Sequence, residues 1–285
     1  ELGHGTFGCV YDAYLEATPQ VRIPVAIKEI LCHNDDGVDA TTIRETTVLR
    51  KLRHDRIVRM LDVFFCHDSV MIIMEKCECD LHFYMKKCPQ FRIPVEEMNR
   101  FVRQLCEGVD FMHASGFLHR DIKPSNLLLT ADRDLKIGDF GLARLYAESV
   151  SMTPRTCTLW YRAPEVLVGA RYDASIDVWS VGCVIAQMCT GKVMFKGDTE
   201  EEMWQCITRA IGQISESETL ALLGRGAHFG KCALSSGGTV VTRETWLQKF
   251  GSWRAILEMC LKFVGRASML QVLEYLMKLK KKQDE

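Results

Sequence analysis

Three glycines near the start of the chain have a spacing that can cradle phosphate groups. Gly3, Gly5 and Gly8 form G-x-G-x-x-G, in which the backbone can approach phosphate oxygens closely. Dinucleotide-binding folds, ligand-free turns and chance also produce this pattern, so its context decides. A β-rich run over residues 9–15 follows the last glycine, where a dinucleotide-binding unit would begin a helix. This context favours a hairpin lid over phosphates.

A lysine on the next β-rich run can neutralise phosphates beneath such a lid. Lys28 ends the stretch VAIK at residues 25–28. Glu45, on the helix predicted over residues 40–52, can direct a carboxylate back at the sheet and hold this ammonium. The alternative for Glu45 is a solvated charge on a helix surface. A fixed ion pair would position the lysine better than a free side chain would.

Three later motifs complete the set. The chain carries HRDIKPSN at residues 119–126, DFG at 139–141 and APE at 163–165. Together with the glycine pattern and VAIK, in this order, they match the signatures of protein kinases, and the chain resembles that family. Phosphoryl transfer needs positioning and charge neutralisation more than covalent participation by the protein, which suits these residue types.

The resemblance implies a role for each polar residue of these motifs. Asp121 would orient the substrate hydroxyl and accept its proton, while Lys123 would neighbour the γ-phosphate of ATP. Asn126 and Asp139 would hold Mg2+ through oxygen ligands. The lysine–glutamate pair completes the catalytic set. Lys123, two residues after Asp121, is typical of serine/threonine kinases, and His119 is expected to be structural.

The same resemblance implies an ATP pocket. Met74 would be its gatekeeper, and Asp80 would reach the ribose. Glu75 and Cys77 would offer backbone hydrogen bonds to the adenine. Apolar walls and the glycine lid complete the pocket, although core packing is the alternative for any one apolar residue. The residues expected to bind the nucleotide are Leu2, Gly3, Gly5, Gly8, Val10, Ala26, Lys28, Met74, Glu75, Cys77, Asp80 and Leu128.

Two further segments resemble the cyclin-dependent kinases of the CMGC group. The sequence ATTIRE at residues 40–45 resembles their partner-binding helix, and TLWYRAPE at 158–165 is characteristic of the group. The resemblance covers roughly residues 1–212. In this family the helix swings out until a cyclin packs against it. The Lys28–Glu45 pair would then be unmade in the lone chain, and activity would depend on a cyclin-like partner.

The resemblance also implies a phosphorylation switch. Thr153 stands at the activating position, and Arg44, Arg120 and Arg144 correspond to the arginines that gather round its phosphate. A phosphate adds about −1.5 to −2 charges and three strong acceptors, which can order a loop against arginines. An unmodified loop threonine is the alternative.

Other positions refine the expected regulation and substrates. Phe7 stands where many family members carry an inhibitory tyrosine, so only Thr6 remains to be modified in the lid. Arg162 suggests a site for proline after the phosphorylated residue, which predicts Ser-Pro or Thr-Pro substrates. Thr153-Pro154-Arg155 lacks a second tyrosine acceptor, which argues against a mitogen-activated kinase.

The elements that must position these residues divide the chain into two kinds of pattern. One helix, over residues 40–52, interrupts a β-rich first part. A second helix then begins near Pro94. A third is predicted over residues 175–190; it is apolar on nearly every side and is ended by Gly191. Residues 213–245 are expected to form a loose, divergent insert. The β-rich runs lie at residues 9–15, 25–31, 58–65 and 70–75.

Composition limits the remaining possibilities. The formal net charge of −1 gives no global field that would favour nucleic acid or an anionic membrane. The 13 cysteines include no pair at the two-residue gap of zinc sites, which indicates reduced thiols and a cytoplasmic or nuclear location. The longest apolar stretches are too short to span a bilayer, and no signal peptide opens the chain.

These observations lead to one expectation with its rivals. The fold class is α+β: a bilobal protein-kinase fold with a small β-rich lobe over residues 1–76, its first strand short or truncated, and a helical lobe over 77–285. The expected function is ATP- and Mg2+-dependent phosphorylation of serine or threonine, proline-directed in the cyclin-dependent manner. The rivals are a partner-binding pseudokinase, another CMGC kinase that needs no cyclin, and a small-molecule kinase.

Overall fold

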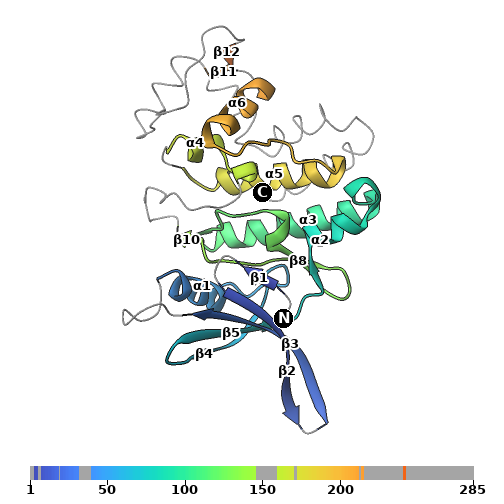
Figure 1. Ribbon diagram of the computed structural model, residues 1–285, viewed down its shortest axis with the longest axis vertical. Coiled ribbons are helices and arrows are strands. Elements are labelled where there is room, and N and C mark those ends of the chain that lie inside the picture. The colour runs from blue at the N-terminus through green and yellow to red at the C-terminus, as the bar shows by residue number, and fades with distance from the viewer. Residues whose placement is uncertain are drawn as a thin grey trace, which may run out of the picture. The chain divides into compact units, whose positions relative to one another are not determined.

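The structure is a computed structural model, and its elements are shown in Figure 1. The described residues are 3–5, 8–18, 20–31, 40–145, 159–169, 172–211, 213–214 and 240–241. The chain divides into two compact units. The first unit comprises residues 1–84, 104–120 and 124–145, and the second comprises 85–103, 121–123 and 146–285.

A five-stranded antiparallel sheet forms the centre of the first unit. Its strand order is β1-β2-β3-β5-β4, and Figure 1 shows β2 and β3 as one long hairpin. The four longer strands confirm the predicted β-rich runs. Ile30, Val63, Val70 and Ile72 pack together as its apolar core. The strands are β1 (Gly3–Gly5), β2 (Gly8–Thr18), β3 (Val21–Leu31), β4 (Met60–Phe65) and β5 (Ser69–Glu75).

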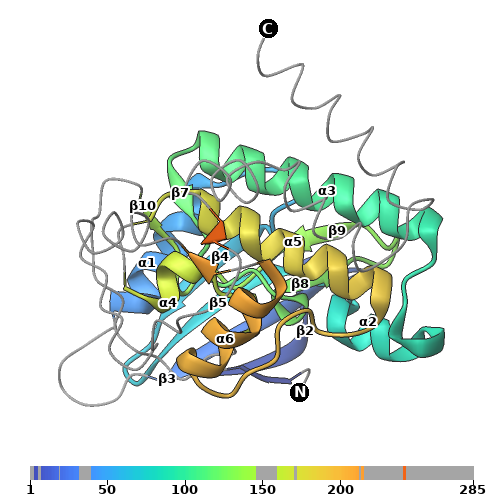
Figure 2. The same ribbon diagram turned by 90° about the horizontal axis from the view of Figure 1, so that it is seen from above.

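Helix α1 (Ala40–Lys51) lies beside β4, as Figure 2 shows, and confirms the predicted helix. Its sequence is rich in threonine, a residue of modest helix propensity. The hydroxyl of Thr46 donates back to the carbonyl of Thr42, 3.0 Å away, within the helix. Burial of Val48 and Leu49 supplies the stability that propensity does not.

Short strands complete the first unit. β6 (Cys79–Asp80), β8 (Leu127–Leu129) and β9 (Leu135–Ile137) form a three-stranded sheet, and β7 (Phe117–Leu118) pairs with β10 (Arg144–Leu145). The 3₁₀ turn η2 (Pro124–Asn126) leads into β8. The sequence did not predict these strands, because two or three residues are too few to show a period of two. The HRD motif follows β7, and the DFG motif lies between β9 and β10.

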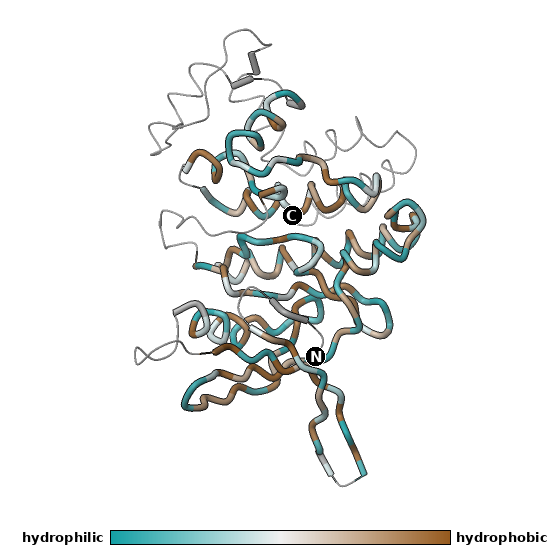
Figure 3. Tube along the Cα trace, in the orientation of Figure 1, coloured by the Kyte–Doolittle hydropathy of each residue, from teal (hydrophilic) through white to brown (hydrophobic). Residues whose placement is uncertain are grey.

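The second unit is mainly helical. Its largest buried helix is α5 (Ser175–Thr190), which has buried residues on every side, and Figure 3 shows its hydropathy along the chain. Helix α3 (Val95–Ala114), of which residues 95–103 belong to this unit and 104–114 to the first, starts directly after Pro94, whose carbonyl accepts the first helical hydrogen bond from Met98. Both helices confirm the sequence pattern. The remaining helices are α2 (Leu81–Lys87), η1 (Pro89–Phe91), η3 (Leu159–Tyr161), α4 (Pro164–Leu167) and α6 (Glu200–Ile211).

Gly191 ends α5 for two separate reasons. Its φ of +71° lies in the left-handed region, and its N–H donates to the carbonyl of Gln187 at 2.8 Å. A Cβ on Gly191 would also lie 2.1 Å from the carbonyl oxygen of Gln90. Both the conformation and the space therefore require glycine here.

The short pair β11 (Gln213–Ile214) and β12 (Val240–Val241) is parallel. The remainder of the predicted 213–245 insert lies outside the described residues. Within the part of the chain that the structure describes, no helix is both long and apolar enough to cross a membrane. The described cysteines are all free thiols, and burial raises the pKa of Cys77 to about 12.

Candidate active site

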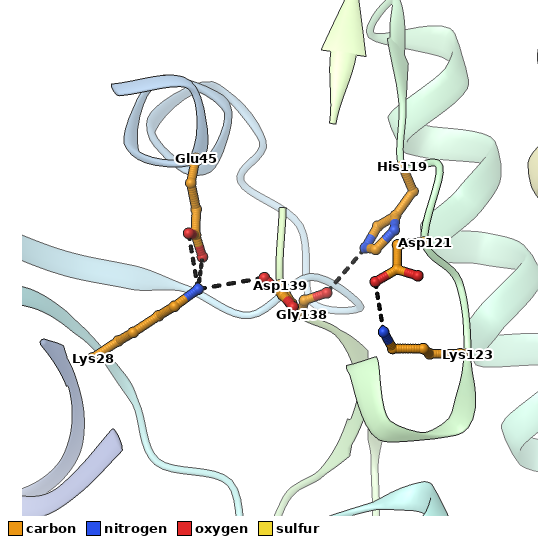
Figure 4. Close-up of polar contacts among 7 residues, drawn as sticks. All are labelled: Lys28, Glu45, His119, Asp121, Lys123, Gly138 and Asp139. Carbon is orange, nitrogen blue, oxygen red and sulfur yellow. Dashed lines mark hydrogen bonds and ion pairs between the residues drawn. The ribbon is translucent and has the colours of Figure 1, made fainter. Parts of the chain in front are cut away.

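The predicted lysine–glutamate pair is formed in the first unit. Lys28 Nζ lies 2.8 Å and 2.9 Å from the two carboxylate oxygens of Glu45, as Figure 4 shows. The exposed fractions of the two side chains are 9% and 2%. β3 supplies the lysine, and α1 supplies the glutamate.

This geometry corrects one expectation. The pair was expected to be unmade in the lone chain, and the structure has it formed. The physical reason is that α1 is already packed through its apolar residues, with Val48 and Leu49 buried. Moving the helix away would break a buried ion pair and leave Lys28 with the more distant carboxylate of Asp139, which is unfavourable.

Asp139 adds a second carboxylate to this cluster. Its Oδ1 lies 3.3 Å from Lys28 Nζ (Figure 4). The backbone of Asp139 has a φ of +56°, a left-handed conformation that costs a non-glycine residue about 1–3 kcal/mol. Its neighbours hold it there: the Gly138 N–H donates to the carbonyl of Asn126 at 2.9 Å, and a ring nitrogen of His119 lies 2.9 Å from the Gly138 carbonyl oxygen. His119 therefore has the structural contact that the sequence led us to expect.

Burial and charge act in opposite directions on Lys28 and Glu45. Burial lowers the pKa of Lys28, but the carboxylates of Glu45 and Asp139 outweigh it, and the pKa is raised above its usual value. Burial raises the pKa of Glu45, and Lys28 offsets part of that effect. The lysine, within 2.9 Å of both carboxylate oxygens, is the positive centre of the cluster.

The expected magnesium residues lie on adjoining segments of the first unit. Asn126 is buried at the end of η2, and its carbonyl accepts the hydrogen bond from the residue before Asp139. Amide and carboxylate oxygens are hard donors of the kind that Mg2+ prefers. Among the described residues, no group of three His, Cys, Asp or Glu side chains is arranged to hold a metal. The donor set fits Mg2+ that takes its remaining ligands from phosphates and water.

The expected catalytic pair of the HRD motif lies in the second unit. Lys123 Nζ and Asp121 Oδ2 are 2.8 Å apart (Figure 4), and both side chains are mostly buried. Arg120, directly before Asp121, has a φ of +72°. A left-handed residue thus directly precedes Asp121, and Asp139 is itself left-handed. Backbone strain of this kind recurs at functional sites.

The expected lid is a hairpin. β1 pairs with β2 through Gly3↔Val10 and Gly5↔Gly8, so the strand continues as predicted. Gly8 has a φ of +146°, and a Cβ on it would lie 1.9 Å from the carbonyl oxygen of Glu29. The close approach of the neighbouring strand therefore requires glycine at position 8, whether or not a phosphate binds there.

Strand register brings several expected nucleotide residues opposite one another. Val10 is paired with Lys28, and Ala26 with Met74. On the smaller sheet, Asp80 is paired with Leu128. Asp80 also has a structural task, because its Oδ1 accepts the N–H of Phe83 at 2.7 Å and so caps α2.

The segment after β5, expected to bind adenine, is fixed at both ends. The N–H of Glu75 donates to the carbonyl of Arg59 at 3.0 Å, and the N–H of Glu78 donates to Leu129 at 2.8 Å. The Cys77 backbone between them makes no hydrogen bond with another described residue outside regular strands and helices. This leaves its amide and carbonyl for a ligand edge.

Sequence reasoning missed the clamp on Glu75. Its Oε1 accepts the N–H of Arg59 at 2.7 Å and lies 2.8 Å from Lys136 Nζ on β9. Lys136 is two residues before Gly138 and thus next to the DFG motif. No local pattern marks this pair, because its members are 61 positions apart in sequence.

The expected regulatory arginines all lie in the first unit. Arg44 is on α1. Arg144 is on β10 and pairs with Leu118 of β7, which lies two residues before Arg120 in the chain. Thr153, Thr6 and Leu2 lie outside the described residues.

A glycine hairpin, a buried lysine between two carboxylates and an HRD-type catalytic segment together define a kinase. The chain belongs to the protein kinase family, whose domain model matches residues 1–273. It is similar to cyclin-dependent kinase 4 of Mus musculus, with 38% identity in an alignment that covers 76% of this chain and 75% of that protein. The sequence-based assignments to the protein-kinase fold and to the cyclin-dependent branch of the CMGC group are confirmed. The chain is a serine/threonine protein kinase that uses ATP.

Proposed function

We propose that this kinase transfers the γ-phosphate of ATP, bound with Mg2+, to serine or threonine followed by proline, and that a cyclin-like subunit and phosphorylation of Thr153 activate it. The observation that carries the proposal is the buried cluster of Lys28, Glu45 and Asp139. A desolvated lysine fixed between two carboxylates is suited to hold phosphate oxygens in one place.

The nucleotide is held by residues of the first unit. The glycine hairpin covers the phosphates, Lys28 neutralises them, and the Glu75–Cys77 backbone hydrogen-bonds the adenine. Ala26 and Met74, paired across β3 and β5, form apolar walls with Val10 and Leu128. Mg2+, when bound, neutralises the phosphate oxygens, and Asn126 and Asp139 are the residues that would hold it.

Asp121 and Lys123 act on the attacking hydroxyl and on the phosphoryl group. The Asp121 carboxylate orients the substrate hydroxyl and takes its proton as the oxygen attacks phosphorus. Lys123, whose ammonium lies 2.8 Å from Asp121, keeps a positive charge beside the transferred group. The bond from the γ-phosphorus to the β,γ-bridging oxygen breaks, and ADP leaves.

The proposed partner rests on the relative's name and on the ATTIRE helix. The similarity to a cyclin-dependent kinase favours a cyclin-like subunit that packs against α1. Since the Lys28–Glu45 pair is formed in the structure, a subunit bound at α1 would raise activity through the segment that carries Thr153 and not by closing this pair. Arg44, Arg120 and Arg144 would receive its phosphate. We also propose a lobe boundary after Lys76 and a cytoplasmic or nuclear location.

Radiolabel transfer from ATP to a Ser-Pro peptide, with and without a cyclin, tests the proposal, with Asp139→Asn as the matched variant. Asparagine tolerates the left-handed backbone of this position, so the exchange removes charge without adding strain. We expect the variant to lose at least about a hundredfold in rate, since it loses a metal-binding carboxylate. Equal labelling by both proteins would remove the role assigned to Asp139.

A Ser-Ala peptide in the same assay tests the proline preference. A wild-type protein that labels it as well as the Ser-Pro peptide would contradict proline direction. A partner-binding pseudokinase would label neither peptide but would still bind the cyclin.

A further inference from the structure

An ion pair joins the strand of the glycine hairpin to the segment that follows β5. Lys76 Nζ lies 2.8 Å from Asp12 Oδ2. Asp12 is on β2, the strand that begins at Gly8, and Lys76 directly follows the last residue of β5. Both residues belong to the first unit, and their side chains are 20% exposed for the lysine and 38% for the aspartate. The pair is thus partly sheltered from water.

The pair connects two elements that the sheet itself keeps apart. In the strand order β1-β2-β3-β5-β4, β3 lies between β2 and β5. Neighbouring strands are about 4.8 Å apart, so the contact spans roughly 10 Å across β3. The long lysine side chain makes this reach possible. The ion pair is therefore a direct link between the glycine hairpin and the segment expected to bind adenine.

Strand register places this link on the face of the sheet that carries the expected nucleotide residues. Asp12 is opposite Ala26, and Ala26 is opposite Met74. Residues directly opposite one another project from the same face, as do residues two apart along a strand. Val10 and Lys28, which are opposite each other, therefore share this face. The ion pair lies next along it, beyond the row of Val10 and Lys28.

The lysine stays charged at neutral pH. Its hydrogen bond to Asp12 raises the pKa of Lys76 above the usual value, and the nearby Tyr14 and Glu78 act in the same direction. Partly exposed ion pairs contribute little to global stability. This one can nevertheless affect binding, because any opening of the hairpin away from the adenine segment would stretch the contact.

We propose that Asp12 and Lys76 are positioning residues for the nucleotide. Their ion pair keeps the glycine hairpin close to the segment after β5 and so slows the dissociation of ATP and ADP. Neither side chain takes part in phosphoryl transfer. The inference rests on the proposed function, in that these two elements enclose the nucleotide. Its signature is a change in nucleotide affinity with little change in the rate at saturating ATP.

The test measures the binding of Mg2+·ADP to the full chain by calorimetry and the KM for ATP with a Ser-Pro peptide. Lys76→Met and Asp12→Asn each remove one charge and nearly keep the size of the side chain. We expect the Kd for ADP and the KM for ATP to rise about threefold in both variants. Displacement kinetics should assign the change to faster dissociation. The value of kcat should stay within about twofold of wild type.

The direction of the two changes separates positioning from a direct effect of charge on the nucleotide. ATP and ADP are anions, so loss of a nearby positive charge weakens their binding and loss of a negative charge strengthens it. Loss of the ion pair instead weakens binding in both variants. Opposite signs in Lys76→Met and Asp12→Asn would therefore overturn the inference.

The charge-reversed variant Asp12→Lys/Lys76→Asp tests the pairing itself. Each single reversal places like charges face to face and should weaken ADP binding, whereas the double variant should return to within about twofold of wild type. Arg22→Met is the matched control. Arg22 pairs with Glu16 at 3.2 Å, but this pair joins strands β2 and β3, which are already hydrogen-bonded to each other. The control should leave both constants unchanged.

Each outcome separates this inference from the proposed function. An unchanged Kd for ADP in both neutral variants, or a double reversal no better than the single ones, would overturn the positioning role while the kinase activity stands. A parallel loss of kcat and thermal stability would mark a merely structural role and overturn it too. Equal wild-type rates with Ser-Pro and Ser-Ala peptides would remove proline direction alone, since ADP binding is measured without a peptide. A wild-type protein that binds no nucleotide would remove both.

Discussion

Lys28 and Glu45 have been removed from water together, and each is stabilised mainly by the other. Breaking such a pair leaves an uncompensated buried charge, which costs about 3–5 kcal/mol. The raised pKa of Lys28 means that the charged lysine stabilises the fold at neutral pH, whereas the raised pKa of Glu45 means that burial of its carboxylate opposes part of this gain. That contribution is lost as the pH rises through the folded-state pKa of the lysine.

Replacing Glu45 with glutamine should shift the pH dependence of catalysis. Burial, which lowers the pKa of Lys28, would then be opposed by Asp139 alone, so this pKa should fall. We expect the alkaline limb of kcat/KM for ATP to move to lower pH and the value at neutral pH to fall about tenfold or more. The measurement is a kcat/KM profile across neutral and alkaline pH.

Glu16→Gln is the control for this experiment. Glu16 pairs with Arg22 at 3.2 Å, but both side chains are about two-thirds exposed, so its removal should leave the profile unchanged. An alkaline limb in Glu45→Gln that coincides with the wild-type limb would show that Glu45 does not set the charge of Lys28.

At the scale of elements, the segment after β5 is connected to β9 by one ion pair. In the proposed function Glu75 binds adenine through its backbone, and its carboxylate is held by Lys136 and by the N–H of Arg59. The position of the adenine edge thus depends on a strand that leads to the DFG motif.

Lys136→Met should therefore weaken nucleotide binding more than it slows the chemical step. The methionine keeps the length of the side chain and removes the charge, so Glu75 loses one of its two partners. We expect the KM for ATP to rise about threefold to tenfold, with kcat within about twofold of wild type. Steady-state kinetics measures both values. Lys86→Met, at an exposed lysine of α2, should change neither, and a fall in kcat alone would contradict this role for the ion pair.

The end of α5 offers a stability test with a built-in comparison. Gly191→Ala adds a Cβ that would lie 2.1 Å from the carbonyl oxygen of Gln90, at a φ of +71°. Gly169→Ala places a Cβ at a similar φ of +67° with nothing within 4 Å. We expect the second change to cost about 1 kcal/mol of unfolding free energy and the first at least about 2–4 kcal/mol.

Denaturant unfolding of the two alanine variants measures the difference. Because the backbone strain is nearly the same in both, the excess loss in Gly191→Ala reports the contact with the backbone of Gln90 and Phe91. Equal losses would show that the loop before α3 gives way without resistance.

At the scale of the whole molecule, the sequence predicted the elements that are long enough to show a periodic pattern or that carry a strong motif. The four longer strands, α1, α5 and the start of α3 followed from alternation, apolar periodicity and Pro94. The contact between Lys28 and Glu45 followed from the motif and from one helix face. The expected opening of that pair did not occur, because burial of α1 depends on packing that no local pattern displays.

The rest depends on residues that are distant in sequence. Strands of two or three residues, such as β7 and β10, arise from tertiary pairing and carry no period of their own. The Lys136–Glu75 and Tyr161–Gln187 pairs join ordinary residue types whose partners only folding identifies. The predicted roles of Thr153 and Thr6 lie outside the described residues and stay predictions.

The separation of Lys28 from its two carboxylates has a consequence for biosynthesis. Glu45 is 17 positions from Lys28, whereas Asp139 is 111 positions away. On a growing chain, the first pair can close long before the ribosome has made the second carboxylate, since short loops close sooner than long ones. The compact unit that contains the pair nevertheless extends to residue 145, so the growing chain can complete this unit only after the DFG segment has been made.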